Sequence, residues 1–348
     1  MKKMLSAACL LALTVAGSVY AQNLEEPLPH PNPPQPYSTT VDEAIPSYVP
    51  VNGLSGSLKG VESNTVTSLM QMWIDDFTKI YPNVKISVDI GGSGQGGPRL
   101  TSGTADFGFI AREMMGREET PFVEKFGYKP LAVAVSGGSF AVKAFTDAIV
   151  FIVHKDNPLD KITFAQLDAI YSATRNRGIR EPITTWGQLG LTGDWADKTI
   201  HAWGVEIPNG YDVFVNQRVL ANGQWREGIG APHTVLPLSN IVAADKYAIS
   251  YTGLAWNNNP NTKVLKLSAR PGDPYHEANF QEVAAQTYPL SRVIYIFANK
   301  APGKSLNPVL NEFIKFALSK EGQADVVKDA IFTPLPSAMQ RAEFEKLK

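Results

Sequence analysis

The sequence predicts an α/β protein of two lobes, each a mixed, mostly parallel sheet flanked by helices. Its 348 residues, 44% hydrophobic and 19% charged, are enough to bury one large or two medium cores. Strand and helix patterns alternate along the chain, which is typical of parallel sheets covered by helices. The order of elements places lobe I in residues 51–146 and 293–348 and lobe II in residues 147–292, so the chain is expected to cross twice between them.

The first predicted unit is a βαβαβ succession in lobe I. It opens with a strand and a loop in "VNGLSGSLKGVESNT", residues 51–65. A helix follows, because apolar side chains recur on one face at helical spacing: Val66, Leu69, Met70, Trp73 and Phe77. The expected capping residues of this helix are Ser63, Asn64 and Thr65. Two further strands are expected in "VKISVDI" at 84–90 and "ADFGFIA" at 105–111.

The remaining elements follow from the same patterns of apolar residues. Strands are expected within residues 147–159, 198–205, 247–256 and 291–300. Helices are expected within residues 163–172, 212–221 and 307–330, with Thr163 as the N-cap of the first.

The first 50 residues are expected to lie outside the two lobes. Residues 1–21 place two lysines before an apolar run and end in "VYA", which is typical of a secretory signal peptide cut after Ala21. The apolar run is too short to span a bilayer, and no later stretch approaches ~20 consecutive apolar residues, so no membrane anchor is expected. Residues 22–50 are predicted to form an extended arm, because eight prolines fall within residues 27–50.

Charge and cysteine usage exclude several classes of function. Signal-peptide removal would leave 30 basic against 33 acidic residues, a net charge of −3, which argues against a general nucleic-acid binder. Cys9, the only cysteine, would leave with the signal peptide, so neither a disulfide nor a thiol nucleophile is expected. The five histidines are scattered without metal-ligand spacing. We expect no metal site and no cofactor, and any anion site must be local.

A G-x-G-x-x-G motif begins at Gly92, directly after a predicted strand. A dinucleotide fold needs a full helix after these glycines, but only seven residues separate Gly97 from the next strand. Two interpretations remain open. The glycines either permit a tight turn with positive φ or form an anion cradle of hydroxyl and backbone N–H groups at a short helix N-terminus. The candidate cradle residues are Ser93, Gly94 and Gln95.

Two catalytic motifs are incomplete. A phosphate loop is excluded because Ala298 stands where that loop requires a glycine, upstream of Lys304 and Ser305. A nucleophile elbow at Ser93 is excluded because Gln95 occupies the position of its last glycine. A phosphate-ester hydrolase therefore stays a distant alternative, and we expect the protein not to be an enzyme.

Arg112 is a further candidate for the site. It directly follows the strand predicted at 105–111, and ligands of parallel sheets collect at the carboxyl ends of strands. The alternative for Arg112 is a surface ion pair with Glu113 or Asp106.

Four stretches of the chain carry a family pattern. They are residues 64–114, which contain "VDIGGSGQGG", residues 147–190, which contain "FIVHKDNPL", the segment "YAISYTGLAW" and the segment "EGQADVVKDAIFTPLP". As a set they resemble the periplasmic phosphate-binding proteins of ABC importers, and the match covers nearly everything after residue 51. This chain has an insertion before Trp186.

The resemblance implies a two-lobed clamshell of the periplasmic-binding-protein type, in which helix N-termini hold an oxyanion between the lobes. By matching position, the first cradle would be Ser63, Asn64 and Thr65, and the second would be Ser93 with Gly94. Each helix N-terminus presents about half a positive charge, and each hydrogen bond to a charged oxygen contributes about 1.5 to 3 kcal/mol. Three such termini would neutralise much of a dianion without an excess of lysine.

The chain departs from the family in the binding loop of lobe II, where it reads "GVEIPNGYD" at residues 204–212. The family's phosphate-pairing arginine falls on Val205, its serine on Asn209 and its threonine on Tyr211. Only Gly210 is unchanged. Asn209, Gly210 and Tyr211 remain candidate ligand residues by position.

A second departure follows the third strand, where Ala111 replaces a serine or aspartate. In the family that aspartate is understood to accept the proton that distinguishes phosphate from sulfate. We expect Arg112 to supply the missing charge and Glu206 the missing acceptor, on the basis of adjacency in the sequence.

We therefore expect a periplasmic or secreted, monomeric receptor that captures phosphate or a related oxyanion by hinge closure and delivers it to an ABC permease. Two alternatives stay open. One is a diverged receptor for another small molecule, which the ring of Tyr211 in place of a small hydroxyl favours. The other is an extracellular binding or adhesion protein on the same scaffold, which transports nothing and uses the Pro-rich arm as a tether.

Overall fold

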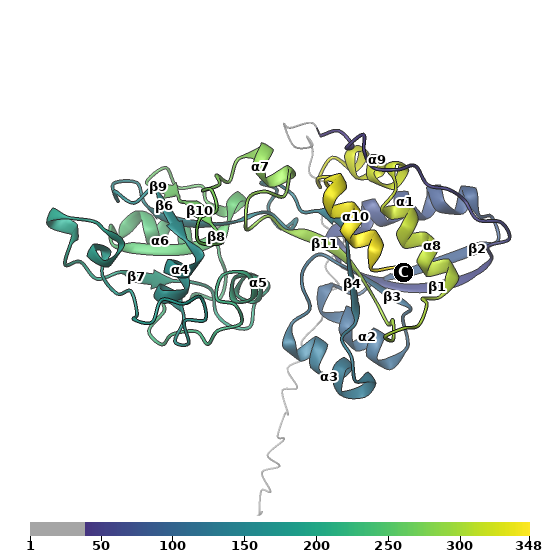
Figure 1. The fold of residues 1–348 in the computed structure, drawn as a ribbon, viewed down its shortest axis with the longest axis horizontal. Helices are drawn as coiled ribbons and strands as arrows, with labels where there is room; N and C mark the ends of the chain where they lie inside the picture. The colour runs from purple at the N-terminus through teal and green to yellow at the C-terminus, as the bar shows by residue number, and fades with distance from the viewer. Residues whose placement is uncertain (1–38) are drawn as a thin grey trace, which may run out of the picture.

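The computed structural model describes residues 39–348. The expected signal peptide and residues 22–38 of the predicted arm lie outside the described residues. Figure 1 shows two lobes side by side, with extended segments of the chain running between them. Lobe I contains the first and last parts of the described chain, and lobe II contains the middle part.

Lobe I is built on a five-stranded sheet in the order β2-β1-β3-β11-β4. The strands are β1 (Gly56–Glu62), β2 (Val84–Ile90), β3 (Phe107–Ile110), β4 (Leu131–Gly137) and β11 (Val293–Ala298). One face of this sheet is covered by three helices that share a core, α1 (Thr67–Ile80), α8 (Pro308–Ala317) and α9 (Lys320–Asp329). Helix α10 (Ser337–Glu345) packs against the edge strand β4. A separate, smaller cluster lies beneath α2 (Gly96–Ser102) and α3 (Gly116–Phe126).

Lobe II is built on a four-stranded sheet in the order β7-β8-β5-β9, with a two-stranded sheet of β10 and β6 beside it. The strands are β5 (Ile149–His154), β6 (Lys161–Thr163), β7 (His201–Trp203), β8 (Ala248–Gly253), β9 (Thr262–Val264) and β10 (Lys266–Ser268). The helices are α4 (Phe164–Tyr171), α5 (Gly210–Arg218), α6 (Leu238–Ala244) and α7 (Phe280–Ala284). Short 3₁₀ turns span Asn64–Val66, Ser93–Gln95, Trp186–Leu189, Gly193–Trp195 and Leu254–Trp256.

The mixed sheets flanked by helices confirm the predicted fold class, but the expected majority of parallel strand pairs is not found. Parallel pairs are β1–β2, β1–β3, β7–β8 and β6–β10. Antiparallel pairs are β3–β11, β4–β11, β5–β8 and β5–β9. In lobe I the reason is that β11 returns from lobe II and inserts between β3 and β4 in the opposite direction. Alternation of elements within one segment of sequence cannot reveal a strand that arrives from elsewhere.

The periodicity that predicted the first helix describes the buried face of α1. Leu69, Met70, Trp73 and Phe77 are all buried, as apolar residues at i, i+3, i+4 spacing should be when a helix packs on a sheet. The Trp73 indole also donates a hydrogen bond to the carbonyl of Gly322 at 2.8 Å. That bond satisfies the one polar atom of a fully buried side chain and ties α1 to α9.

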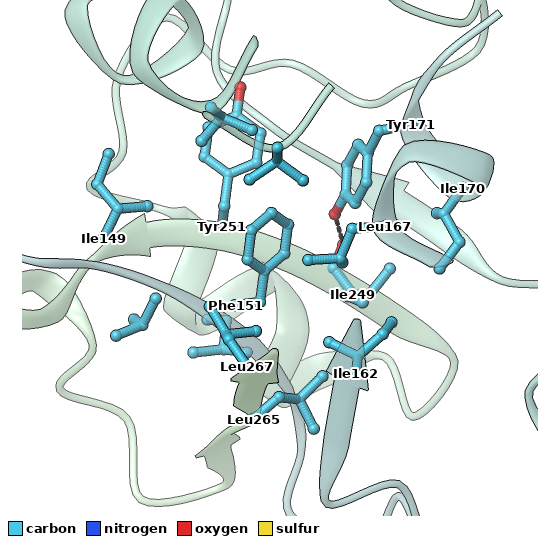
Figure 2. Close-up of a cluster of buried hydrophobic side chains, with 14 of the residues drawn as sticks. Ile149, Phe151, Ile162, Leu167, Ile170, Tyr171, Ile249, Tyr251, Leu265 and Leu267 are labelled. Carbon is cyan, nitrogen blue, oxygen red and sulfur yellow. Dashed lines mark hydrogen bonds between the residues drawn. The ribbon is translucent and has the colours of Figure 1, made fainter. Parts of the chain in front are cut away.

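The core of lobe II is a continuous apolar cluster on both sides of β5 and β8 (Figure 2). Tyr171 lies at the end of α4, and its ring centre is 6.0 Å from that of Tyr251. Its hydroxyl donates a hydrogen bond to the carbonyl of Ile249 at 3.1 Å. Helix α4 starts at the predicted cap, because Thr163 accepts a hydrogen bond from the backbone N–H of Gln166 at 3.1 Å. The position of this helix is thus set by its own sequence.

The described part of the Pro-rich arm, residues 39–50, has no helix or strand but packs against lobe I. Ile45 is buried, and the hydroxyl of Tyr48 lies 2.8 Å from that of Tyr81 and 2.9 Å from Glu312 Oε2. Asp42 accepts a hydrogen bond from the backbone N–H of Ser337, the first residue of α10, at 2.9 Å. The extended segment is therefore fastened to lobe I and packs there beside the C-terminal helix α10.

Two connections join the lobes, the first between β4 and β5 (residues 138–148) and the second between α7 and β11 (residues 285–292). They run next to each other. Gly138 donates to the carbonyl of Arg292 at 2.7 Å, and Ile149 donates to that of Leu290 at 3.1 Å. The first connection contains two non-glycine residues with positive φ, Ala144 at 67° and Thr146 at 56°. Such backbone conformations are sparsely populated and cluster at ligand clamps and switch regions. Residues 146/147, where we place the first lobe limit, lie in the first connection, and residues 292/293, where we place the second, lie where the second connection meets β11.

Candidate functional site

A cavity of about 240 Å³ opens where the two lobes and the two connections meet. Lobe I contributes the turn before α1, the turn before α2 and the end of β3. Lobe II contributes the N-terminus of α5, and each connection contributes residues of its own. The lining residues are Asn64, Thr65, Ser93, Ala111, Arg112, Ala144, Thr146, Asn209, Gly210, Tyr211 and Arg292.

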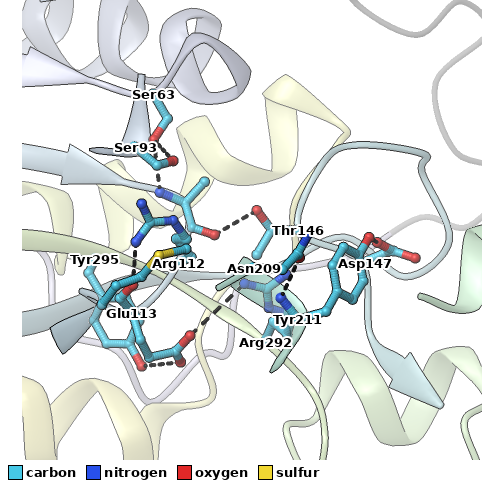
Figure 3. Close-up of polar contacts among 12 residues, drawn as sticks. Ser63, Ser93, Arg112, Glu113, Thr146, Asp147, Asn209, Tyr211, Arg292 and Tyr295 are labelled. Carbon is cyan, nitrogen blue, oxygen red and sulfur yellow. Dashed lines mark hydrogen bonds and ion pairs between the residues drawn. The ribbon is translucent and has the colours of Figure 1, made fainter. Parts of the chain in front are cut away.

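The turn before α1 differs from the predicted N-cap. A 3₁₀ turn over Asn64–Val66 precedes the helix, and neither Ser63 nor Val66 makes a side-chain cap. Instead Ser63 accepts a hydrogen bond from the backbone N–H of Ala111 at 3.1 Å and shares one with the Ser93 hydroxyl at 2.6 Å (Figure 3). Ser63 thus lies behind the cavity wall and joins the ends of β1 and β3 to the turn before α2.

The first backbone N–H groups of a helix have no intrahelical acceptor, and here no side chain caps them either. Asn64 and Thr65 supply these groups and line the cavity. The hydroxyl of Thr65 is buried and has no hydrogen-bond partner within residues 39–348. The first predicted cradle therefore presents free donors to the cavity through Asn64 and Thr65.

The glycine motif combines the two interpretations that the sequence left open. Gly92 has a φ of 77°, and its N–H and that of Gly91 donate to the carbonyl of Glu62 at 3.0 and 3.1 Å. Ser93 begins the following 3₁₀ turn and lines the cavity, whereas Gly94 and Gln95 do not appear in its lining. The first glycine thus permits the tight turn, and the turn brings a hydroxyl and a helix start to the cavity.

Arg112 lines the cavity and is held by a buried carboxylate. Its guanidinium donates to both oxygens of Glu118, at 2.8 and 2.7 Å, and to the carbonyl of Glu113 at 2.8 Å. The Arg112 side chain is 11% exposed and that of Glu118 is 3% exposed. The surface pair with Asp106 or with the carboxylate of Glu113, considered from the sequence, is thus replaced by a bidentate pair with Glu118 on α3. That pair fixes the guanidinium at the end of β3.

The N-terminus of α5 supplies the lobe II side of the cavity. Asn209 caps the helix, since its side chain accepts from the backbone N–H of Tyr211 at 3.0 Å. Gly210 allows the lobes to touch, because a Cβ there would lie 3.2 Å from Arg112 Cδ. The ring of Tyr211 is part of the lobe II wall, with its hydroxyl bonded to Asp147 Oδ1 at 3.4 Å and to the Trp256 indole at 3.1 Å.

The expectation for Glu206 is wrong, because this residue does not reach the cavity. Its side chain is 52% exposed and pairs with His233 on the surface of lobe II. Its backbone N–H donates to the carbonyl of Pro232 at 2.9 Å. That contact fastens the loop after β7 to a neighbouring segment, away from the cavity lining. Adjacency to Val205 in the sequence was therefore a poor guide.

Sequence reasoning missed Arg292 and Thr146. Both line the cavity, and both belong to the connections between lobes. Thr146 donates its hydroxyl proton to the carbonyl of Ala111 at 2.9 Å, and Arg292 stands directly before β11. The available signal was their position at the expected crossings near 146 and 292, since ligands between two lobes contact the segments that join them.

The cavity is lined by two arginines and no Asp or Glu, with the nearest carboxylates one layer behind. Asp147 accepts from the Tyr211 hydroxyl and from the backbone N–H of Ala255 at 2.9 Å. Burial raises the pKa of Asp147 to about 6, against the opposing effects of the Ala255 hydrogen bond and of Arg292. The two arginines therefore make the electrostatic potential in the cavity positive, and the carboxylates behind the lining partly offset it.

The raised pKa of Asp147 predicts a pH dependence of stability. The folded protein binds the proton of Asp147 more tightly than the unfolded chain does, so this contribution to stability is present below about pH 4 and is lost as the pH rises to about 6. In the wild type, the unfolding free energy should therefore decrease from about pH 4 to about pH 6. In the Asp147→Asn variant, which has no carboxyl group to titrate, this decrease should be absent. Urea unfolding of both proteins from pH 4 to 7 measures it. Parallel pH profiles would contradict the prediction.

Within residues 39–348, no group of three or more His, Cys, Asp or Glu side chains is placed to hold a metal ion. No helix in the same range has the length and apolar character needed to cross a membrane.

Comparison with known proteins places this arrangement in a family. The model of the PBP superfamily domain matches residues 48–321. The chain belongs to the PBP superfamily. The chain is 38% identical over 307 residues to the phosphate-binding protein PstS of Pseudomonas aeruginosa, and the alignment covers 88% of this chain and 92% of that protein. The phosphate-binding protein PstS of Staphylococcus epidermidis is 27% identical over 299 residues, covering 85% and 84%.

The fold of this PBP superfamily member also matches solved structures. PstS from Borrelia burgdorferi has a TM-score of 0.53 and 18% identity, covering 81% of this chain and all of that one. At this identity the likeness shows the fold alone. The resemblance to phosphate-binding proteins of ABC importers and the two-lobed α/β fold are thereby confirmed. The expectation that the chain is not an enzyme agrees with these relatives, which are named as binding proteins.

Proposed function

We propose that this protein captures phosphate or a related tetrahedral oxyanion between its two lobes as the solute receptor of an ABC importer. The observation that carries the proposal is the cavity itself, where the starts of α1, α2 and α5 meet Arg112 and Arg292. Helix N-termini and arginines are the groups that bind oxyanions without a metal. The relatives named for phosphate binding support the same ligand.

The size of the cavity supports a small anion over a larger ligand. Its volume of about 240 Å³ lies below the roughly 300–1,000 Å³ typical of sites for drug-sized molecules. The ring of Tyr211, which suggested a different ligand, is held in the wall by Asp147 and Trp256. The ring is therefore a fixed part of the wall, and its presence alone does not favour a receptor for a bulkier molecule.

The cellular setting and the partner are part of the proposal. The N-terminal pattern supports export to the periplasm or beyond, and hinge closure around the anion would create the form that an ABC permease recognises. We propose that the receptor acts as a monomer, because one chain supplies both sides of the cavity.

Titration calorimetry tests the ligand. The chain from residue 22 onward is unfolded, dialysed and refolded to remove bound anion, then titrated with phosphate and with sulfate at one ionic strength. We expect saturable binding of phosphate at one site. We also expect sulfate to compete with it, because no Asp or Glu lines the cavity to accept the proton that distinguishes phosphate. If neither anion binds, the oxyanion function is wrong, and the non-transport alternative would be the one to pursue.

A further inference from the structure

Arg292 carries a buried positive charge that the protein does not fully satisfy. The residue is 6% exposed and lines the cavity. Its Nε atom is buried with no hydrogen-bond partner within residues 39–348. Arg112 in the same cavity, by contrast, is paired with both oxygens of Glu118 at 2.7–2.8 Å, through its two terminal nitrogens. A buried cation with unused donors is costly unless an anion completes it.

Two aromatic rings of α5 hold the Arg292 guanidinium in place. Its central carbon lies 5.8 Å from the ring centre of Tyr211 and 5.3 Å from that of Phe214. A guanidinium that rests on aromatic faces keeps its N–H donors for other partners, because these donors point outward in the guanidinium plane. The side chain therefore reaches across from the second connection and rests on lobe II.

The carboxylate that faces Arg292 is only loosely paired with it (Figure 3). Arg292 Nη2 lies 4.0 Å from Glu113 Oε2, which is beyond hydrogen-bonding distance. Glu113 is itself held on lobe I, since its Oε1 accepts from the Tyr295 hydroxyl at 3.1 Å. In this arrangement the carboxylate attracts Arg292 without occupying its donors.

We propose that Arg292 binds the captured oxyanion directly and takes the role of the second-lobe arginine that the family resemblance places at Val205, with Glu113 as its resting counter-charge. This inference rests on the proposed function, since it requires an anionic ligand. Val205 is buried and apolar, so the charge has to come from another part of the chain. The connection before β11 supplies it. The anion then joins lobe I through Arg112 and lobe II through a guanidinium supported by α5.

The position of Arg292 also links binding to the hinge. Its carbonyl accepts from Gly138, which couples the two connections next to the cavity. An anion that draws the guanidinium away from Glu113 therefore acts on the segment about which the lobes would close.

Calorimetry with inorganic phosphate tests the proposal on Arg292→Gln, Arg292→Lys, Glu113→Gln and the double variant Arg292→Gln/Glu113→Gln. Arg292→Gln should weaken binding by roughly 10- to 150-fold, the range for losing a hydrogen bond to a charged group. Arg292→Lys should fall between this variant and the wild type, because lysine keeps the charge without the planar donors. Arg99→Gln, which removes an arginine paired with Asp89 outside the cavity, serves as the control and should bind like the wild type.

The Glu113→Gln variant separates a binding role from a structural one. Removal of the competing carboxylate should tighten phosphate binding, roughly two- to fivefold, the size of a weak ion pair. The gain should vanish in the double variant, because it acts through Arg292. Thermal unfolding shows whether Arg292→Gln folds. If it does not, the Glu113→Gln variant still tests the proposal, because weaker or unchanged phosphate binding by that variant would overturn it.

The outcomes distinguish the two levels of inference. If the Arg292→Gln variant binds phosphate as tightly as the wild type, the role of Arg292 is overturned and the oxyanion function still stands. Wild-type protein that binds neither phosphate nor sulfate would overturn the function, and the role of Arg292 with it.

Discussion

Replacement of Arg112 by glutamine is expected to weaken phosphate binding and to destabilise lobe I at the same time. Glu118, which is 3% exposed, would lose both hydrogen bonds from the guanidinium. Removal of one partner from a buried ion pair typically costs about 3–5 kcal/mol, because the other charge stays buried and unpaired. The anion would lose one of its two arginines. Urea unfolding measures the first effect and calorimetry measures the second.

The double variant Arg112→Gln/Glu118→Gln is the matched control. It removes the unpaired charge, so most of the lost stability should return, while phosphate binding should stay weak. Glutamine can still accept the hydrogen bond that the backbone N–H of Met115 donates to Glu118 at 3.0 Å. Undiminished binding by either variant would mean that Arg112 only supports α3.

Gly97→Ala should produce the second large effect, through packing. A Cβ at residue 97 would lie 2.6 Å from the carbonyl oxygen of Glu118 and 2.8 Å from its Cβ. Helices α2 and α3 would have to separate, and overpacking of this kind usually costs about 1–3 kcal/mol. Because Glu118 positions Arg112, weaker phosphate binding should accompany the loss of stability, although residue 97 does not line the cavity.

Gly116→Ala provides the comparison for Gly97→Ala. A Cβ at residue 116 meets nothing within 4 Å, and its backbone conformation suits any residue. The unfolding free energy should therefore stay within about 0.5 kcal/mol of the wild type, and phosphate binding should not change. Equal losses at residues 97 and 116 would show that the contact with Glu118 is not the cause.

Much of the fold could be predicted because its determinants are local. The buried face of α1 follows from apolar spacing, β2 spans the predicted residues 84–90, and Thr163 caps α4 as its hydroxyl suggests. The strand directions were harder. Antiparallel β11 depends on a return from lobe II, which no local pattern encodes.

The candidate site divides along the same line. Ser93 could be found because a glycine turn before a short helix has a sequence pattern, and Asn64 and Thr65 because the family resemblance assigns them by position. Arg112 could be found as well, from its place directly after a strand. Arg292 could not, since it joins the same cavity only after the chain has passed through the whole of lobe II. Glu206 was misplaced for the converse reason. It is close in sequence to the replaced binding loop, but its loop turns toward Pro232 and His233.

The fastening of both described chain ends to lobe I governs how motion of the protein can be observed. Asp42 is bonded to Ser337, and Lys346 near the last residue donates to the carbonyl of Ala132 at 3.0 Å. A fluorophore pair placed at the two ends would travel with one body and give no signal on closure. Immobilisation through either end would leave lobe II unhindered. A single cysteine at exposed Asp194 in lobe II, paired with a dye at the C-terminus, would instead report directly on anion-driven movement.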